Sequence, residues 1–366
     1  HRDLHSFPTR RSSDLFTDSL FQQLHALTRP KKMAVFFDDD LYDEQGKRHS
    51  PRFKPGVNPE ALLSGDLAGP IAVQREAWLT TGGTWRKIEA PWFFKLLKIQ
   101  ERFGWNSIQH IQNITLSFPE NNRTNTESCL LALVSHLMEK QASIEVFPLN
   151  AERWTLRQEI PAPPPPVQIF IHSRGDLDLL DRCITSIENF TSYNNKTIGI
   201  ILNTQETDAD ISQWTKKFLE RSPSNILITP QDQDNYPTLI NRATNSSSAE
   251  YICFINADSV AIEKSWLEEL VRAATSENVA GASPRLLQPG SGKIESTGNI
   301  LGLNGLAGSA FWGEPFTPNA KHPLDWINTN RDVATLTSAC FLIKKSDFLS
   351  AAGMNGEKFS DRKSVV

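Results

Sequence analysis

The sequence predicts an α/β protein built around a mostly parallel β-sheet with helices on both faces. Three observations lead to this prediction. Short apolar segments alternate with amphipathic helical segments in the second half of the chain, which is the pattern of strands joined by crossover helices. A run of prolines divides the 366-residue chain. On each side of it an apolar strand is followed by acidic residues, which indicates two incomplete copies of one fold.

Composition and charge restrict the class of protein. The chain is 39% apolar and 22% charged, which excludes low-complexity disorder, and its length suits about two domains. No run approaches the roughly 18 apolar residues of a membrane span. A formal net charge of −4 argues against a nucleic-acid partner, which requires a basic face. The widely separated cysteines predict buried thiols in a reducing compartment, and not a disulfide framework or metal site. They are Cys129, Cys183, Cys253 and Cys340.

Both ends of the chain resemble translated sequencing-adapter sequence. Residues 5–15 read HSFPTRRSSDL and residues 361–366 read DRKSVV. We therefore expect residues 1–15 and 361–366 to be non-native tails, with a flexible native tail as the alternative. Each tail carries a net charge of +1, which leaves −6 for the rest of the chain. On this interpretation the parent protein continues beyond both ends.

A proline-rich segment predicts the domain boundary. Residues 161–166 read PAPPPP, and consecutive prolines donate no ladder hydrogen bonds and favour a stiff, extended spacer. We expect a first domain over 16–150, a linker over 151–166 and a second domain over 167–360. A proline-rich partner motif is the alternative interpretation of the segment.

The first half of the chain begins with a predicted buried strand at 33–37 (MAVFF), and Asp38, Asp39 and Asp40 follow it directly. Pro59 predicts the start of a short helix that ends at residue 63. Further elements are expected at 71–73 and 92–102.

In the second half, strands and helices alternate. The apolar residues of 176–189 lie on one helical face, and so do those of 264–274. Apolar runs predict strands at 167–171, 198–202, 226–228 and 251–255. Alternation of this kind predicts a parallel sheet, which binds ligands beyond the carboxyl ends of its strands.

Aspartates in Asp-x-Asp spacing occur at four places, a pattern too common to decide anything by itself. The pair at 38–40 alone lies at the end of an apolar strand. The pair at 176–178 begins a helix, where carboxylates suit the helix dipole. The pairs at 208–210 and 232–234 lie in polar loops, where we expect them to be solvated.

Asn256-Ala257-Asp258 follows the predicted strand at 251–255. Carboxylates at a strand end can hold Mg²⁺ or Mn²⁺, which prefer oxygen ligands. Such an ion can bridge a diphosphate and neutralise its developing charge. A solvated acidic turn is the alternative at Asp258, and with less weight at Asp38–Asp40.

These segments resemble bacterial family 2 glycosyltransferases with tandem domains of the GT-A type, including rhamnosyltransferase-like members. Residues 34–83 resemble the metal-binding strand end and acceptor side of a first domain, in which Phe53-Lys54-Pro55 and Asn58-Pro59 match closely. In a second domain the resemblance covers the nucleotide-binding opening (167–193), the metal-binding strand end (251–270) and the start of the acceptor site (337–360). It implies a Rossmann-like GT-A fold in two tandem, incomplete copies.

The resemblance implies an inverting transfer of a sugar from a nucleotide-diphosphate sugar to a glycan or lipid-linked glycan acceptor. Mg²⁺ or Mn²⁺ would hold the diphosphate while an acceptor hydroxyl attacks the anomeric carbon. Asp258 carries over as the metal ligand of the second domain, and Asp38 and Asp40 as those of the first. The residues implied around the nucleotide are His172, Ser173, Arg174, Asn203 and Asn256, together with Asn241 and Arg242, which match the family's asparagine-containing helix start beside the base.

The sequence departs from the family pattern at several of these positions. His172 replaces a proline, Asn203 replaces an aspartate that contacts the nucleoside, and Asn256 replaces the first acid of the metal motif. In the first domain, residues 91–95 (PWFFK) replace the segment of the catalytic carboxylates. We therefore expect that domain to be degenerate and catalytically silent.

The catalytic base of the second domain is expected beyond Ser360, so that the chain as given turns over no sugar donor. Two other functions stay open. One is a non-catalytic GT-A module that binds nucleotide-sugar or glycan, and the other is a nucleotidyltransferase or unrelated nucleotide-binding domain. We expect no nucleic-acid partner, no transmembrane segment and a cytoplasmic location, with peripheral attachment to the inner membrane as the alternative.

Overall fold

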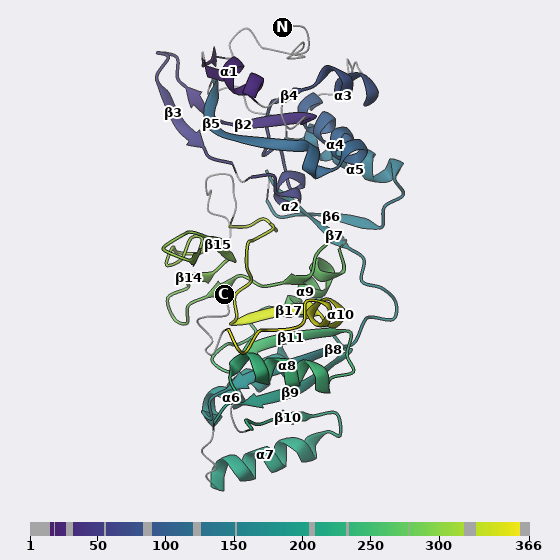
Figure 1. Ribbon diagram of the computed structural model, residues 1–366, viewed down its shortest axis with the longest axis vertical. Coiled ribbons are helices and arrows are strands. Elements are labelled where there is room, and N and C mark those ends of the chain that lie inside the picture. The colour runs from purple at the N-terminus through teal and green to yellow at the C-terminus, as the bar shows by residue number, and fades with distance from the viewer. Residues whose placement is uncertain are drawn as a thin grey trace. The chain divides into compact units, whose positions relative to one another are not determined.

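The computed structural model describes residues 15–17, 19–26, 32–54, 56–82, 90–119, 126–150, 152–204, 209–231, 234–276, 278–317 and 327–358 (Figure 1). The chain divides into two compact units. Unit 1 takes its described residues from His1–Leu156 and Thr317–Asp332, and unit 2 from Arg157–Phe316 and Val333–Val366. Nearly all of both predicted tails lies outside the described residues, so that their non-native origin stays a prediction.

The sheet of unit 1 is centred on β2 (Ala34–Tyr42). It has the order β1-β5-β2-β3, and β4 also pairs with β2. β5 runs parallel to β2, whereas β3 and β4 run antiparallel to it. The other strands are β1 (Leu15–Phe16), β3 (Arg48–Arg52), β4 (Ile71–Val73) and β5 (Ile108–Pro119).

Helices cover both faces of this sheet because apolar residues alternate along β2. Ala34 and Phe36 pack against α2, α3 and α4, whereas Val35 and Phe37 pack against α1. These helices are α1 (Ser19–Ala26), α2 (Pro59–Leu63), α3 (Arg75–Thr80) and α4 (Pro91–Phe103). A 3₁₀ turn (Trp105–Ser107) and α5 (Thr126–Glu139) complete the helical part.

The predicted linker over 151–166 differs from the structure in its first half. β6 (Ile144–Pro148) and β7 (Trp154–Gln158) form a two-stranded sheet, so that residues 154–158 belong to a strand. Trp154 is buried, and its indole N–H donates to the carbonyl oxygen of Leu63 at 2.7 Å. Burial of the Trp154 side chain holds the beginning of this strand in unit 1. The proline pattern at 161–166 carries no information about this packing.

The sheet of unit 2 has the order β10-β9-β8-β11-β17-β12. Its first four strands are parallel, whereas β17 and β12 run antiparallel to their neighbours. The strands are β8 (Val167–Ser173), β9 (Lys196–Leu202), β10 (Ile226–Ile228), β11 (Tyr251–Asn256), β12 (Gly281–Ala282) and β17 (Cys340–Lys344). Two hairpins follow β12, namely β13 (Leu286–Leu287) with β14 (Ile294–Ser296), and β15 (Asn299–Leu301) with β16 (Ala307–Ser309).

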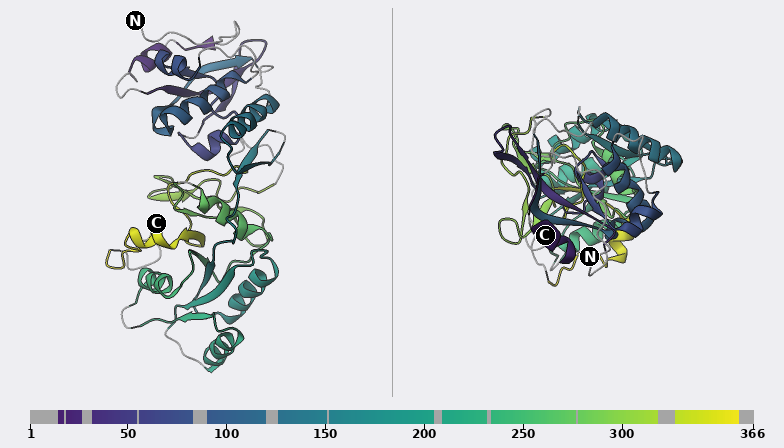
Figure 2. Two further views of the ribbon diagram at one scale, coloured as in Figure 1. Left: turned by 90° about the vertical axis from the view of Figure 1, so that its right-hand side faces the viewer. Right: turned by 90° about the horizontal axis from the view of Figure 1, so that it is seen from above.

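Both faces of this sheet are covered, as Figure 2 shows. Ile169 and Cys253 belong to a core with α6, α7 and α9, whereas Phe170 and Phe254 belong to a core with α8 and α10. The helices are α6 (Leu177–Asn189), α7 (Ala209–Arg221), α8 (Tyr236–Ser246), α9 (Trp266–Thr275) and α10 (Lys345–Ser350). This arrangement confirms the predicted α/β class, and in unit 2 it confirms the mostly parallel sheet covered on both faces. In the described part of the unit 1 sheet, β2 and β5 form the one parallel pair.

Two further predictions can be compared with the described residues. All four cysteines are free and buried, as predicted. None of the helices within the described ranges has the length and apolar character to cross a membrane.

Candidate functional site

The carboxyl edge of the unit 2 sheet brings together most of the residues that the sequence singled out. β8, β9 and β11 run parallel, so that their carboxyl ends meet at one edge. His172 and Ser173 end β8, Asn203 follows β9, and Asn256 ends β11. Asn256 pairs with His172, which pairs in turn with Ile201. Ligands of such sheets bind at this edge.

Backbone hydrogen bonds hold these strand ends in register. The N–H of Asn203 donates to the carbonyl oxygen of Ser173 at 2.7 Å, and the N–H of Ala257 donates to that of His172 at 2.9 Å. The His172 ring is buried and lies edge-on to Tyr236, with ring centroids 5.1 Å apart. Its Nε2 lies 3.5 Å from the amide nitrogen of Asn203. The imidazole of His172 and the side-chain amide of Asn203 are therefore neighbours at this edge of the sheet.

Asp258 lies beyond the paired part of β11 and its side chain is exposed. The turn that carries it is well anchored. The carbonyl oxygen of the buried Asn256 accepts from the N–H of Ser259 at 3.0 Å and from the thiol of Cys183 at 3.7 Å. Arg174 is likewise exposed, directly after β8. An exposed carboxylate on an anchored turn can supply an oxygen ligand to a hard cation, so that Asp258 fits the predicted metal.

Asn241 and Arg242 lie in the middle of α8, and not at a helix start as predicted, since the helix begins at Tyr236 with Asn235 as its cap. The Asn241 side chain donates to the carbonyl oxygen of Met354 at 2.8 Å and accepts from its N–H at 2.9 Å. The guanidinium of Arg242 donates to Thr229 O at 3.1 Å and pairs with the carboxylate of Asp234. Both side chains therefore hydrogen-bond to other parts of unit 2: Asn241 to the segment at Met354, and Arg242 to the loop that carries Thr229 and Asp234.

The pair at 232–234 was expected to be solvated, and Asp232 lies outside the described residues. Asp234 corrects that expectation, because its side chain is only 13% exposed and forms the ion pair with Arg242. Burial raises the pKa of Asp234, but the Gln231 N–H and the Arg242 guanidinium outweigh it and lower that pKa below its usual value. At 208–210, Asp210 belongs to the first turn of α7, and Asp208 lies outside the described residues.

In unit 1 the acidic residues lie inside a strand, which corrects their predicted place at a strand end. β2 continues through all three aspartates to Tyr42, and Asp39 pairs with Leu116 of β5 and Arg52 of β3. Bulges on both sides of Asp38 locally displace the register. All three aspartates are buried.

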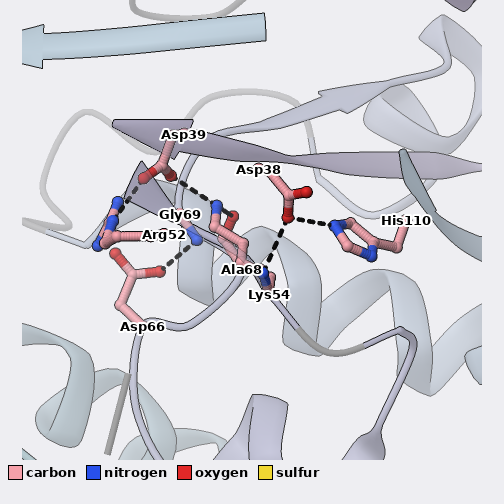
Figure 3. A network of polar contacts seen from close by, with 8 residues as sticks. All are labelled: Asp38, Asp39, Arg52, Lys54, Asp66, Ala68, Gly69 and His110. Carbon is pink, nitrogen blue, oxygen red and sulfur yellow. Dashed lines mark hydrogen bonds and ion pairs between the residues drawn. The ribbon is translucent and has the colours of Figure 1, made fainter. Parts of the chain in front are cut away.

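Each of these aspartates has a basic partner, and Figure 3 shows the partners of Asp38 and Asp39. Asp38 lies 2.8 Å from His110 Nε2, and its carboxylate accepts from the backbone N–H of Lys54 at 2.8 Å. Asp39 pairs with Arg52 and, at 2.7 Å, with Lys54 Nζ. Asp40 pairs with Arg48 at 2.7 Å. A divalent ion would have to displace several of these groups, so that Asp38 and Asp40 do not fit the predicted metal as they stand.

Burial shifts the pKa of two basic members of the cluster. It lowers the pKa of Lys54, while the negative charge of Asp39 acts in the opposite direction. Burial also lowers the pKa of His110, again against the effect of Asp38. The His110 ring stacks on Phe36 with centroids 4.7 Å apart. The sequence did not single out these basic partners. The match at Phe53-Lys54-Pro55 was the available signal for Lys54.

The segment 91–95, predicted to replace the catalytic carboxylates, forms the first turns of α4. Phe93 and Phe94 are buried in a core with α5 and Trp154. Lys95 is also buried, and its Nζ bonds to the Thr81 hydroxyl at 3.0 Å and to carbonyl oxygens of Gly82 and Trp78. Burial lowers the pKa of Lys95 to about 8.

Comparison with known proteins gives one family match. Residues 168–349 match the family model described as Glycosyl transferase family 2. Over 348 residues the chain is 28% identical to the O-antigen biosynthesis protein RfbC of Myxococcus xanthus, covering 91% of this chain and 26% of the relative. It is 26% identical to protein y4gI of Sinorhizobium fredii (strain NBRC 101917 / NGR234), covering 89% of this chain and 37% of the relative. The chain thus spans between a quarter and two fifths of these relatives.

Two solved structures show a weaker similarity. The mannosyltransferase PcManGT from Pyrobaculum calidifontis, in complex with GDP-Man and Mn²⁺, aligns with a TM-score of 0.36 and 13% identity, covering 54% of this chain and 49% of that one. GalNAc-T7 with UDP, GalNAc and Mn²⁺ aligns with a TM-score of 0.43 and 9% identity, covering 58% and 41%.

Proposed function

The chain belongs to glycosyl transferase family 2, as its resemblance predicted, and from this premise we propose that unit 2, within the full-length parent protein, transfers a sugar from a nucleotide-diphosphate sugar. The proposed acceptor is a hydroxyl of a growing polysaccharide or lipid-linked glycan, and the anomeric carbon inverts. The name of the M. xanthus relative, an O-antigen biosynthesis protein, supports a polysaccharide acceptor. The observation that carries the proposal is the gathering of His172, Ser173, Asn203, Asn256 and Asp258 at the carboxyl edge of one parallel sheet.

The roles of these residues follow from their exposure and hydrogen-bonding groups. His172 and Asn203 offer neutral donors and acceptors for the polar edge of a nucleoside. The exposed Arg174 offers a cation for a phosphate. The buried Asn256 supports the turn that presents Asp258. Asn241 and Arg242 we propose as supports of the nucleotide site, because they fix the segment around Met354 and the loop at Thr229.

Asp258 would hold the divalent metal, Mg²⁺ or Mn²⁺. Such an ion, when bound, neutralises charge on the leaving diphosphate. The exposed carboxylate leaves room for diphosphate oxygens to complete the oxygen ligands that these ions prefer.

Unit 1 we propose as a second, degenerate copy that is catalytically silent. In both units a strand of the acidic motif pairs antiparallel with a strand that leads into a short helix: β2 with β4 and α3, and β11 with β17 and α10. This likeness supports the tandem arrangement. Phe93 and Phe94 are packed in the core of unit 1, and aromatic groups cannot accept a proton from an acceptor hydroxyl.

Calorimetry with UDP, GDP, CDP and dTDP, in Mn²⁺ and in chelator, tests the proposal. We expect one of these nucleotides to bind with Mn²⁺ and to bind at least tenfold more weakly in chelator. Asp258→Ala should cause the same loss, because it removes the proposed metal ligand.

Glu220→Ala is the matched control, since it removes an exposed carboxylate from the C-terminal turn of α7. It should leave binding unchanged. Equal affinity with and without metal, or in Asp258→Ala, would contradict the metal-dependent donor site. Binding without sugar transfer by the full-length parent would instead favour a non-catalytic module.

A further inference from the structure

The acidic strand of unit 1 differs from that of unit 2 in how its carboxylates are placed. Asp258 lies past the last paired residue of β11 and is exposed. Asp38, Asp39 and Asp40 are buried within β2, which is paired with β5 on one side and with β3 on the other. Buried carboxylates are costly unless they are paired, so that this strand requires positive charge from some source.

Lys54 supplies that charge from within the chain. Its side chain is 1% exposed, and its Nζ lies 2.7 Å from Asp39 Oδ2 and 2.6 Å from the carbonyl oxygen of Ala68. Its backbone N–H also donates to Asp38 at 2.8 Å. One residue therefore contacts two of the three aspartates and ties them to the loop at residue 68.

The loop around Gly69 leaves room for the ammonium group of Lys54. Gly69 has φ +62°, and a Cβ at this position would lie 3.2 Å from Lys54 Nζ and 3.5 Å from Asp39 Oδ2. A glycine is therefore favoured here both by the left-handed backbone and by the close approach. The Gly69 N–H donates to Asp66 at 3.1 Å, which holds the turn beside the cluster.

The strand on the parallel side of the acidic motif also contributes. In unit 2 this neighbour is β8, which ends in His172 and Ser173, whereas in unit 1 it is β5. β5 carries His110, whose Nε2 lies 2.8 Å from Asp38. Arg52 and Arg48 complete the set of partners of Asp39 and Asp40.

We propose that Lys54 is a built-in cation that takes the place of a divalent metal at the acidic strand of unit 1, so that this unit folds without metal and binds none there. Lys54 acts as a structural counter-ion for Asp39 and positions Asp38 through its backbone N–H. The inference concerns unit 1 and does not depend on the proposed transferase activity of unit 2.

Hydrogen exchange of the whole chain, read by mass spectrometry in peptides that cover β2 and the loop around Gly69, tests the proposal directly. With Asp258→Ala as background to silence the proposed site of unit 2, these peptides should exchange equally in chelator and in Mn²⁺. One buried oxygen of the cluster, Asp40 Oδ1, has no hydrogen-bond partner among the described residues. Protection by Mn²⁺ that is lost in Asp40→Asn would therefore overturn the proposal.

Lys54→Met provides the second arm. Removing one partner of a buried pair should speed exchange in the β2 peptide roughly 100-fold or more, and Mn²⁺ should now restore part of the protection by replacing the lost charge. Lys95→Met is the matched control. It also removes a buried lysine of unit 1, but Lys95 lies in α4, bonds to Thr81 and contacts no aspartate of this cluster. Its exchange should not respond to Mn²⁺.

A third variant keeps the test decisive if Lys54→Met does not fold. Asp39→Asn combined with Lys54→Met removes both charges, and it should fold and be indifferent to Mn²⁺. Unchanged exchange in Lys54→Met, or a Mn²⁺ response in the double variant, would count against a counter-ion role for Lys54.

Discussion

Single residues of one chemical type have different roles in this chain, and their partners decide which. Asp258 is exposed on a turn, Asp39 is buried against Arg52 and Lys54, and Asp234 pairs with Arg242. Asp176 accepts from the N–H of Leu179 at 2.9 Å as the cap of α6. A carboxylate in this protein is thus a candidate ligand, a buried ion-pair member or a helix cap according to what lies within hydrogen-bond distance.

Lys95 leads to a prediction of pH-dependent stability. Its pKa falls from the ordinary 10.5 to about 8 through burial, so that between these values the unfolded chain binds more protons at this site than the folded chain. Stability of unit 1 should therefore rise with pH through this window, by on the order of 3 kcal/mol for this group. Below pH 8 the cost of burying the charge is fully present.

Urea unfolding of the wild type and of Lys95→Met, below pH 8 and near pH 10.5, measures this contribution. The quantity of interest is the difference in pH dependence between the two proteins, because other lysines and tyrosines titrate in both. Parallel curves for the two proteins would show that folding does not lower the pKa of Lys95.

At the scale of elements, the start of α6 offers a matched pair of aspartates. Asp176 caps the helix, whereas Asp178 is an exposed residue of the first turn without a capping bond to the helix. Asp176→Ala should destabilise unit 2 by about 1 kcal/mol, the usual value of an N-cap. Asp178→Ala removes the same charge near the helix dipole and should cost only about 0.3–0.5 kcal/mol. Chemical unfolding of both variants gives the comparison, and equal losses would mean that charge, and not the cap, stabilises the helix.

At the scale of the whole molecule, the two units have separate hydrophobic cores. A nucleotide with Mn²⁺ at the proposed site should therefore stabilise unit 2 and leave unit 1 unchanged. At about 100 times the dissociation constant, this linkage amounts to about 2.7 kcal/mol. Hydrogen exchange should slow in peptides that carry His172, Asn203 and Asp258, but not in the peptide that carries Asp38–Asp40. Protection of the second peptide would place a nucleotide in unit 1.

The sequence by itself determined the main elements of both sheets. The strands at 226–228 and 71–73 and the helix at 59–63 have the predicted bounds, because turn residues and prolines delimit these short apolar runs. Alternation of strands and helices was enough to predict a covered parallel sheet in unit 2, and the position of Asp176 predicted a helix start. The edge that gathers His172, Asn203 and Asn256 followed from strand order alone.

Only the tertiary structure decided the state of the aspartates at 38–40. Read along the chain, they follow five apolar residues and look like the end of a strand. In the fold, pairing with β3 and β5 extends β2 through them. Basic side chains at residues 48, 52 and 54 pair with Asp39 and Asp40, and His110 hydrogen-bonds to Asp38. The antiparallel strand β17 and the mid-helix place of Asn241 were likewise beyond local pattern. Charge pairing and strand pairing depend on residues distant in sequence, whereas periodicity and capping depend on neighbours, and this is why the elements were predictable and the charge state of unit 1 was not.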